Sequence, residues 1–237
     1  MTGSAVDKIS KPSGDRIRIT QSKKFKFPDG KEQTDPFEAI ILDHVVVQQY
    51  YPGEYKRDEV APPVCFAIGE AIASMAPSTA SQNKQCDTCA ACPQNQWGTA
   101  RQGKGKACKE GRLIAVVPPD FDDETPIWLI QASATALKAY DTYVSQCMAN
   151  YNAPPIKVIT TIGFDPKQDY PTLRFAGIRP NSRIAESVGR MEEARQRLLV
   201  EPDYPAPATE PGANRAVAGP AAPGSAFGGR SAARIIK

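Results

Sequence analysis

The residues best suited to chemistry are four cysteines that lie close together in the chain. They form the run Cys86-Asp-Thr-Cys89-Ala-Ala-Cys92-Pro, followed after a basic loop by Cys108. A Cys-x-x-Cys spacing lets two thiolates converge on one ion, and a distant cysteine closes the cage. Four thiolates satisfy tetrahedral zinc, so the spacing predicts zinc bound by Cys86, Cys89, Cys92 and Cys108. Consecutive two-residue gaps are also typical of iron–sulfur proteins, so an iron–sulfur cluster and unliganded thiols are open alternatives.

Few other residues suggest catalysis or metal binding. The only histidine, His44, lies in an apolar run and is interpreted as an ordinary strand residue, although in a zinc site it could replace Cys86 or Cys89. A single histidine excludes most Ser-His-Asp, Cys-His and His-rich sites. Cys65 and Cys147 lie in apolar contexts and are predicted to be small buried residues. We therefore expect a protein that is not an enzyme.

The loop between Cys92 and Cys108 combines an indole, amides, glycines and cations. Gly98-x-x-x-x-Gly103-Lys104 has the spacing of a phosphate-binding P-loop, but Gly105 stands where the magnesium-binding hydroxyl belongs. Nucleotide hydrolysis is therefore excluded, and the composition favours phosphate contacts and base stacking. The alternative is that Trp97 packs over the cysteines while the lysines only solvate the loop.

A group of tyrosines ends a long apolar run and enters a loop, where side chains can also stack on bases. The predicted nucleic-acid contacts are Trp97, Arg101, Lys104, Lys106, Lys109 and Arg112 in the basic loop, together with the tyrosines Tyr50, Tyr51 and Tyr55.

Composition limits where such a protein works and what it binds. The 237 residues hold 29 Lys and Arg against 26 Asp and Glu, a net charge of +3. That near balance excludes a histone-like polycation but permits a basic groove. No apolar run approaches the roughly 20 residues of a membrane span, and the amino end lacks the apolar stretch of a signal peptide. We expect a cytoplasmic protein, in the host cytoplasm if it is viral, with no membrane partner and no small-molecule substrate.

The pattern of apolar residues predicts the elements that position these groups. A basic arm over residues 1–34 holds two edge strands, and residues 35–180 form a core with the cysteine-rich insertion at 81–112. Core strands are predicted over residues 37–51, 62–69, 112–117, 126–131, 156–164 and 170–178, with one helix from Ser133 or Thr135 to Tyr151. A second helix is predicted over residues 182–200, and the Ala-, Pro- and Gly-rich residues 201–237 are predicted to be a disordered tail.

This order of elements predicts a mainly β fold with two helices. A helix between the third and fourth strands of a five-stranded antiparallel set is the order of the OB-fold barrel, whose strand face and loops bind oligonucleotides. An α+β sandwich would produce a similar order.

Several motifs together resemble tailed-phage single-stranded DNA-binding proteins over residues 37–180. They are Pro62-Pro-Val-Cys-Phe-Ala-Ile-Gly69, Cys92-Pro-x-Asn-x-Trp-Gly98, Gly103-Lys-Gly-Lys-Ala-Cys-Lys109, the strand with Pro126-Ile-Trp128, and Ser133-Ala-Thr-Ala-Leu-Lys138. The resemblance implies an OB-type core, in some lineages a small zinc subdomain, and coating of single-stranded DNA during replication and recombination. Replication or recombination proteins are the further partners it implies. Many such proteins end in an acidic tail, whereas residues 201–237 hold three acids and four bases.

From these observations we expect a largely sequence-independent single-stranded DNA-binding protein. The alternative function is that of a zinc-stabilised structural or adaptor protein whose loop binds a protein partner.

Overall fold

The structure, a computed structural model, describes residues 15–53 and 61–204. Its strands are β1 (Arg16–Ile19), β2 (Phe25–Lys26), β3 (Glu32–Gln33), β4 (Phe37–Tyr50), β5 (Cys65–Gly69), β6 (Cys108–Val117), β7 (Trp128–Ala132), β8 (Val158–Phe164) and β9 (Leu173–Pro180). Its α-helices are α1 (Leu137–Tyr151), α2 (Ile184–Gly189) and α3 (Met191–Leu198), and its 3₁₀ helices are η2 (Ile72–Ser74), η3 (Pro93–Asn95), η4 (Ala134–Ala136) and η5 (Pro155–Lys157). Tyr55 and the predicted tail beyond residue 204 lie outside the described residues.

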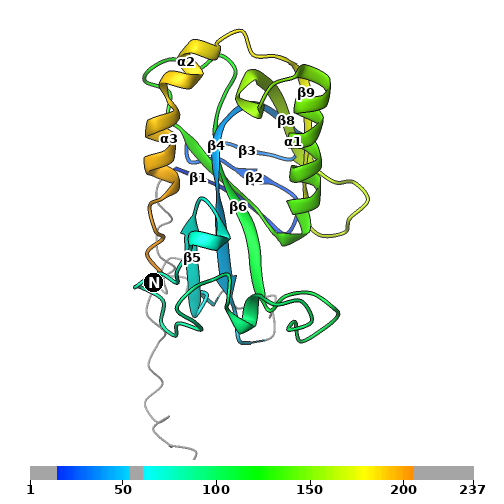
Figure 1. Cartoon of the computed structure of the whole chain (residues 1–237). Helices are drawn as coiled ribbons and strands as arrows, with labels where there is room; N and C mark the ends of the chain where they lie inside the picture. The colour runs from blue at the N-terminus through cyan, green and yellow to red at the C-terminus, as the bar shows by residue number, and fades with distance from the viewer. Residues whose placement is uncertain (1–14, 54–60, 205–237) are drawn as a thin grey trace, which may run out of the picture. The chain divides into compact units, whose positions relative to one another are not determined.

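The sheet is organised around β4, which pairs with three other strands (Figure 1). One edge of β4 pairs with β6 over most of its length, while the other pairs first with β8 and then with β5. The register with β6 shifts between Ile41 and Asp43, a β-bulge that bends the strand and increases its twist. This confirms the long strand predicted from residues 37–51. The bend explains how one edge of β4 can pair with β8 near its start and with β5 near its end.

The strand order is β3-β2-β1-β7-β6-β4-β8-β9, with β5 attached to β4 off this path. All pairs are antiparallel except β1 with β7. The sheet curls into a half-barrel in which α1 lies between β7 and β8, an arrangement compatible with an OB-like architecture. These are the third and fourth core strands when β5, which lies off the main path of the sheet, is not counted. The barrel is not closed by β7 against β9, because β1 occupies the free edge of β7. The mainly β class is thus confirmed.

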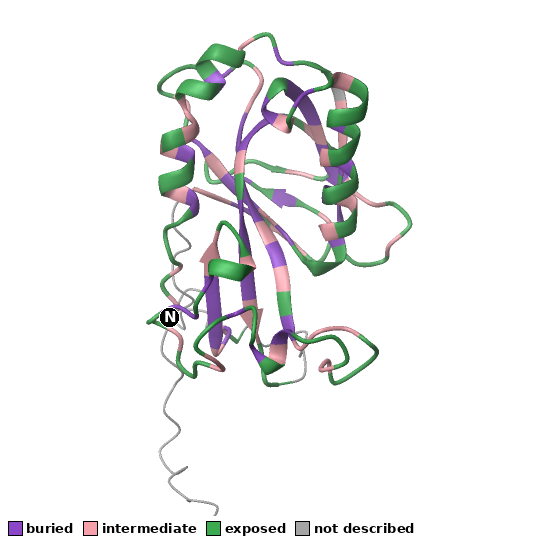
Figure 2. Cartoon of the chain, in the orientation of Figure 1, coloured by how far each residue is buried: buried purple, intermediate pink, exposed green. Residues whose placement is uncertain are grey.

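Helices cover both faces of the sheet (Figure 2). On one face α1 buries Tyr140, Tyr143 and Cys147 against the strands, so Cys147 is a core residue as predicted. On the other face α3 buries Ala194 and Leu198. Because β4 and β6 are covered on both sides, they are apolar over consecutive residues and do not alternate.

The predicted basic arm contributes strands to the sheet and aromatic rings to the core. Phe25 is fully buried, with its ring stacked 4.3 Å from that of Phe164 and in edge contact with Phe37 at 5.0 Å. The neighbouring Phe27 meets Phe37 and Trp128. The described part of the arm is therefore an integral part of the folded unit.

The single helix predicted over residues 182–200 is wrong, because the structure has two helices there. The first ends at Gly189, a residue with low helix propensity, and the second begins at Met191. Arg190 between them turns toward the loop before β7 and donates to the carbonyl oxygens of Asp122 and Thr125. The break therefore lets α3 follow the sheet while Arg190 attaches the connection to it.

Candidate functional site

Five cysteines, not four, surround one small cavity beside the end of β4. Cys65 and Cys108 are the first residues of β5 and β6, and both pair with Tyr50 from opposite sides. Residues that pair directly across strands point to the same face, so the register brings Cys65 and Cys108 to one side of the sheet. Cys86, Cys89 and Cys92 of the insertion complete the wall, and the cavity has a volume of about 10 Å³. Cys65 was predicted only as a small buried residue, and the pairing of β5 with β4, which the spacing of the cysteines does not reveal, adds it to the cluster.

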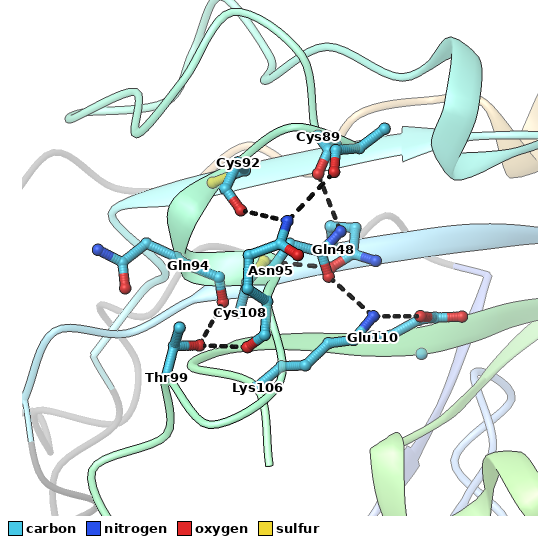
Figure 3. Close-up of polar contacts among 12 residues, drawn as sticks. Gln48, Cys89, Cys92, Gln94, Asn95, Thr99, Lys106, Cys108 and Glu110 are labelled. Carbon is cyan, nitrogen blue, oxygen red and sulfur yellow. Dashed lines mark hydrogen bonds and ion pairs between the residues drawn. The ribbon is translucent and has the colours of Figure 1, made fainter. Parts of the chain in front are cut away.

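Hydrogen bonds to residues on either side of β5 hold the insertion in place. Asn83 N–H donates to Val64 O at 2.8 Å, and Cys89 N–H donates to Met75 O at 2.9 Å. Cys92 precedes η3, whose buried Asn95 donates from Nδ2 to Cys89 O at 2.9 Å (Figure 3). The loop that carries the thiols is therefore anchored by its own backbone.

Four of the five thiols are buried, and Cys86 is half-buried. Burial is the main cause that raises the pKa values of these thiols, and the neighbouring thiols raise them further. The pKa of Cys86 and that of Cys108 are each raised to about 12, and that of Cys89 to about 11. Without a cation these groups are thiols at neutral pH. Within residues 15–53 and 61–204, no three or more His, Cys, Asp or Glu side chains are arranged so that they could hold a metal ion.

Gln48, like Asn95, is a polar residue buried against this cluster, and it has 1% of its surface exposed. Cys108 Sγ donates to Gln48 Oε1 at 3.1 Å, and both residues line the cavity (Figure 3). The Nε2 atom of Gln48 is buried and has no hydrogen-bond partner among the residues that the structure describes. A buried hydrogen-bond donor without an acceptor lowers the stability of the folded state by about 1–3 kcal/mol. The amide group of Gln48 is therefore suited to an acceptor, which Cys108 does not offer while it is a protonated thiol.

The basic loop after Cys92 is compact and presents its indole to solvent. Gly98 N–H donates to Lys104 O at 3.2 Å and Gly105 O at 3.0 Å, and positive φ angles at Gly98 and Gly103 allow the turn. Trp97 is 78% exposed, with Lys106 Nζ 5.6 Å from its ring centroid. The alternative in which Trp97 packs over the cysteines is therefore wrong.

A groove of about 460 Å³ lies between this loop and the end of β4. It brings together four residues predicted to contact nucleic acid, and its other walls are amides, small residues and a hydroxyl. The four predicted residues are Tyr50, Tyr51, Arg101 and Lys109, and the others are Gly53, Gln94, Thr99, Ala100, Gln102 and Ala107. Tyr50 also lines the cysteine cavity, so the groove and the cluster share a wall.

The remaining predicted contacts are placed differently. Lys104 is exposed on the loop. Lys106 donates to Asn95 Oδ1 at 3.2 Å and lies 3.9 Å from Glu110, while Arg112 pairs with Glu110 at 2.8 Å and has 16% of its side chain exposed. Arg112 lies within β6 and not in the loop, because the strand begins at Cys108, earlier than predicted. These two cations stabilise the base of the loop instead of lying free for phosphates.

His44 lies too far along β4 to join the cysteines. Its ring is 5.3 Å from that of Tyr140 on α1, whereas the cluster lies at Tyr50. Six residues of strand correspond to about 20 Å. The suggestion that His44 replaces Cys86 or Cys89 is wrong.

No protein-family model, curated protein or solved structure matches this chain. Among the helices of the described residues, none is long and apolar enough to cross a membrane.

Proposed function

We propose that this chain binds single-stranded DNA in the groove between the end of β4 and the basic loop, without strong sequence preference and without catalysis. The observation that carries the proposal is the convergence of Tyr50, Tyr51, Arg101 and Lys109, from separate parts of the chain, on one groove. Aromatic rings for base stacking beside cations for the backbone are the combination that sequence-independent single-strand binders use.

The charges of the groove support a contact with phosphates. In the part of the chain that the structure describes, no carboxylate forms an ion pair with Arg101, Lys104 or Lys109. Their charge is thus available to a ligand, unlike that of Lys106 and Arg112. Stacking on the tyrosines and on exposed Trp97 requires unpaired bases, because the faces of bases in a duplex are already stacked.

The position of the groove in the sheet also supports the proposal. In OB-folds the loop between the first and second strands borders the oligonucleotide site. Here the corresponding connection, from β4 to β6, contains both the cysteine insertion and the basic loop. The half-barrel is compatible with that architecture, and the resemblance to phage proteins adds replication and recombination as the setting.

We further propose that one zinc ion in the cysteine cavity stabilises the groove, and that its binding draws together thiols that line the cavity but that the described residues do not yet arrange as a metal site. Cys108 directly precedes Lys109, and Cys92 lies two residues before Gln94. Because Lys109 and Gln94 line the groove, a metal ion that holds the two cysteines also holds these two residues in position. The cavity, at about 10 Å³, is just large enough for one water-sized particle. Four thiolates are the ligand set that tetrahedral zinc prefers in structural sites. Zinc at such a site contributes folding free energy and leaves chemistry to other residues.

Titration of the full chain with fluorescent oligonucleotides tests the proposal. Arg101, Lys104 and Lys109, which form no ion pair with the described carboxylates, predict a log–log salt slope of about −2 for a single strand, at about −0.7 per phosphate neutralised. We expect duplex DNA of the same length to bind more weakly at every salt concentration. Tighter binding of the duplex, or no binding of either, would overturn the proposed function.

A further inference from the structure

The cavity offers five thiols, whereas tetrahedral zinc needs four. Cys65, Cys89, Cys92 and Cys108 have exposed fractions of 7%, 6%, 4% and 8%, and Cys86 is the half-buried exception. Structural zinc sites are closed to water, so burial separates the thiols that enclose an ion from a thiol at the rim.

The elements that carry the thiols divide them in the same way. Cys65 and Cys108 begin the strands on either side of Tyr50. Cys89 N–H donates to Met75 O at 2.9 Å, and Cys92 N–H donates to Cys89 O at 3.4 Å. Cys86 makes no backbone hydrogen bond of this kind with the described residues. The thiols of Cys92, Cys65 and Cys89 interact electrostatically with that of Cys108 and also with that of Cys86, which shares a hydrogen bond with Cys92. These three thiols therefore have two candidates for a fourth partner, and burial favours Cys108 over the half-buried Cys86.

We propose that zinc in this cavity is bound by Cys65, Cys89, Cys92 and Cys108, that Gln48 donates a hydrogen bond to the Cys108 sulfur, and that Cys86 lies outside the ligand set. The assignment rests on the proposed metal centre and replaces the sequence-predicted Cys86 with Cys65. Binding converts four thiols to thiolates and releases their four protons to solvent, while zinc keeps its charge of 2+.

The amide of Gln48 fits both forms of the site. In the thiol form Oε1 accepts the Cys108 hydrogen, which leaves Nε2 without a partner. Once Cys108 is a thiolate it has no hydrogen to donate, and a half-turn of the amide presents Nε2–H to the sulfur. Four thiolates and Zn²⁺ carry a net charge of −2, which a buried N–H donor stabilises. The unpaired amide is thereby explained.

Alkylation of the zinc-loaded parent tests the ligand set without a mutation. Iodoacetamide followed by peptide mapping should modify Cys86 while one zinc per chain is retained, and Cys65, Cys89, Cys92 and Cys108 should react only after chelation. Protection of Cys86 by zinc, or loss of zinc on its alkylation, would overturn the assignment. Parent protein that binds no zinc when reconstituted anaerobically would instead refute the proposed metal centre itself.

Variants provide the second test, read out as zinc per chain and as the cobalt–thiolate absorption of the Co²⁺-substituted protein. Cys86→Ser should keep one metal and the full four-thiolate spectrum, and Cys65→Ser should lose thiolate intensity and zinc. Loss of metal from Cys86→Ser together with retention by Cys65→Ser would overturn the assignment in favour of the ligands predicted from sequence, Cys86, Cys89, Cys92 and Cys108. Because Cys65→Ser can also disturb β5, circular dichroism and the alkylation map accompany it.

Gln48 is tested against its neighbour on the same strand. Gln48→Met removes the donor, and zinc affinity in chelator competition should fall about 10- to 100-fold, the usual effect of losing a partner of a metal ligand. Gln49→Met is the matched control, because Gln49 bonds Tyr204 and Gln131 and does not line the cavity. Equal zinc affinity of the Gln48→Met protein and the parent would refute the role of the amide.

Discussion

Replacement of Trp97 by alanine should separate DNA binding from folding. The indole is 78% exposed, and its described ring contact is with Lys106 Nζ at 5.6 Å, so little apolar surface is lost from the folded state. Exposed substitutions of this kind change stability by no more than about 0.5 kcal/mol. Base stacking on an aromatic residue is worth about 1–3 kcal/mol, which corresponds to a loss of affinity of about 5- to 150-fold.

The assay is fluorescence anisotropy with a labelled single strand at several salt concentrations. The salt slope of Trp97→Ala should equal that of the parent, because stacking neutralises no phosphate. Met148→Ala is the control, since Met148 is also large and exposed but lies on α1. If Trp97→Ala protein keeps its zinc and its melting temperature and binds as tightly as the parent, stacking by Trp97 is refuted.

Three further predictions concern charge, metal and core. Arg101→Ala and Lys109→Ala should each make the log–log salt slope less negative by about 0.7, and an unchanged slope would show that these cations do not contact phosphate. Removal of zinc by a chelator should make residues 86–108 sensitive to protease while circular dichroism of the sheet persists; equal protease resistance with and without zinc would contradict this. Phe25→Ala should lower the free energy of unfolding by about 3–5 kcal/mol in denaturant titration, because its ring is fully buried, and a loss below 1 kcal/mol would contradict the packing of β2.

Local sequence signals predicted much of the fold because the elements concerned are strongly patterned. The β-branched run that forms β4 has no glycine or proline, and the apolar residues of α1 recur with helical spacing. The split between α2 and α3 was missed because one glycine weakens a helix without ending it; the contacts of Arg190 with a distant loop decide the break.

The candidate site was predictable only in part, because strand register brings its residues together. The spacing of Cys89, Cys92 and Cys108 suggested a cluster, but the pairing of β5 with β4 adds Cys65, and chain spacing does not reveal that pairing. Arg112 was likewise predicted to contact nucleic acid, but within β6 its charge is paired with Glu110. Tertiary structure thus determines which cysteines line the cavity and which cations remain available to a ligand.

Photo-crosslinking of the zinc-loaded chain to a single-stranded oligonucleotide, with the attached peptides identified by mass spectrometry, tests the central claim most directly. We expect crosslinks at Tyr50, Tyr51 and Trp97. An unlabelled single strand should compete with the crosslinked oligonucleotide, and the same concentration of duplex DNA should not. Efficient crosslinks confined to α1 and β9, with none in residues 50–53 or 94–109, would contradict the account.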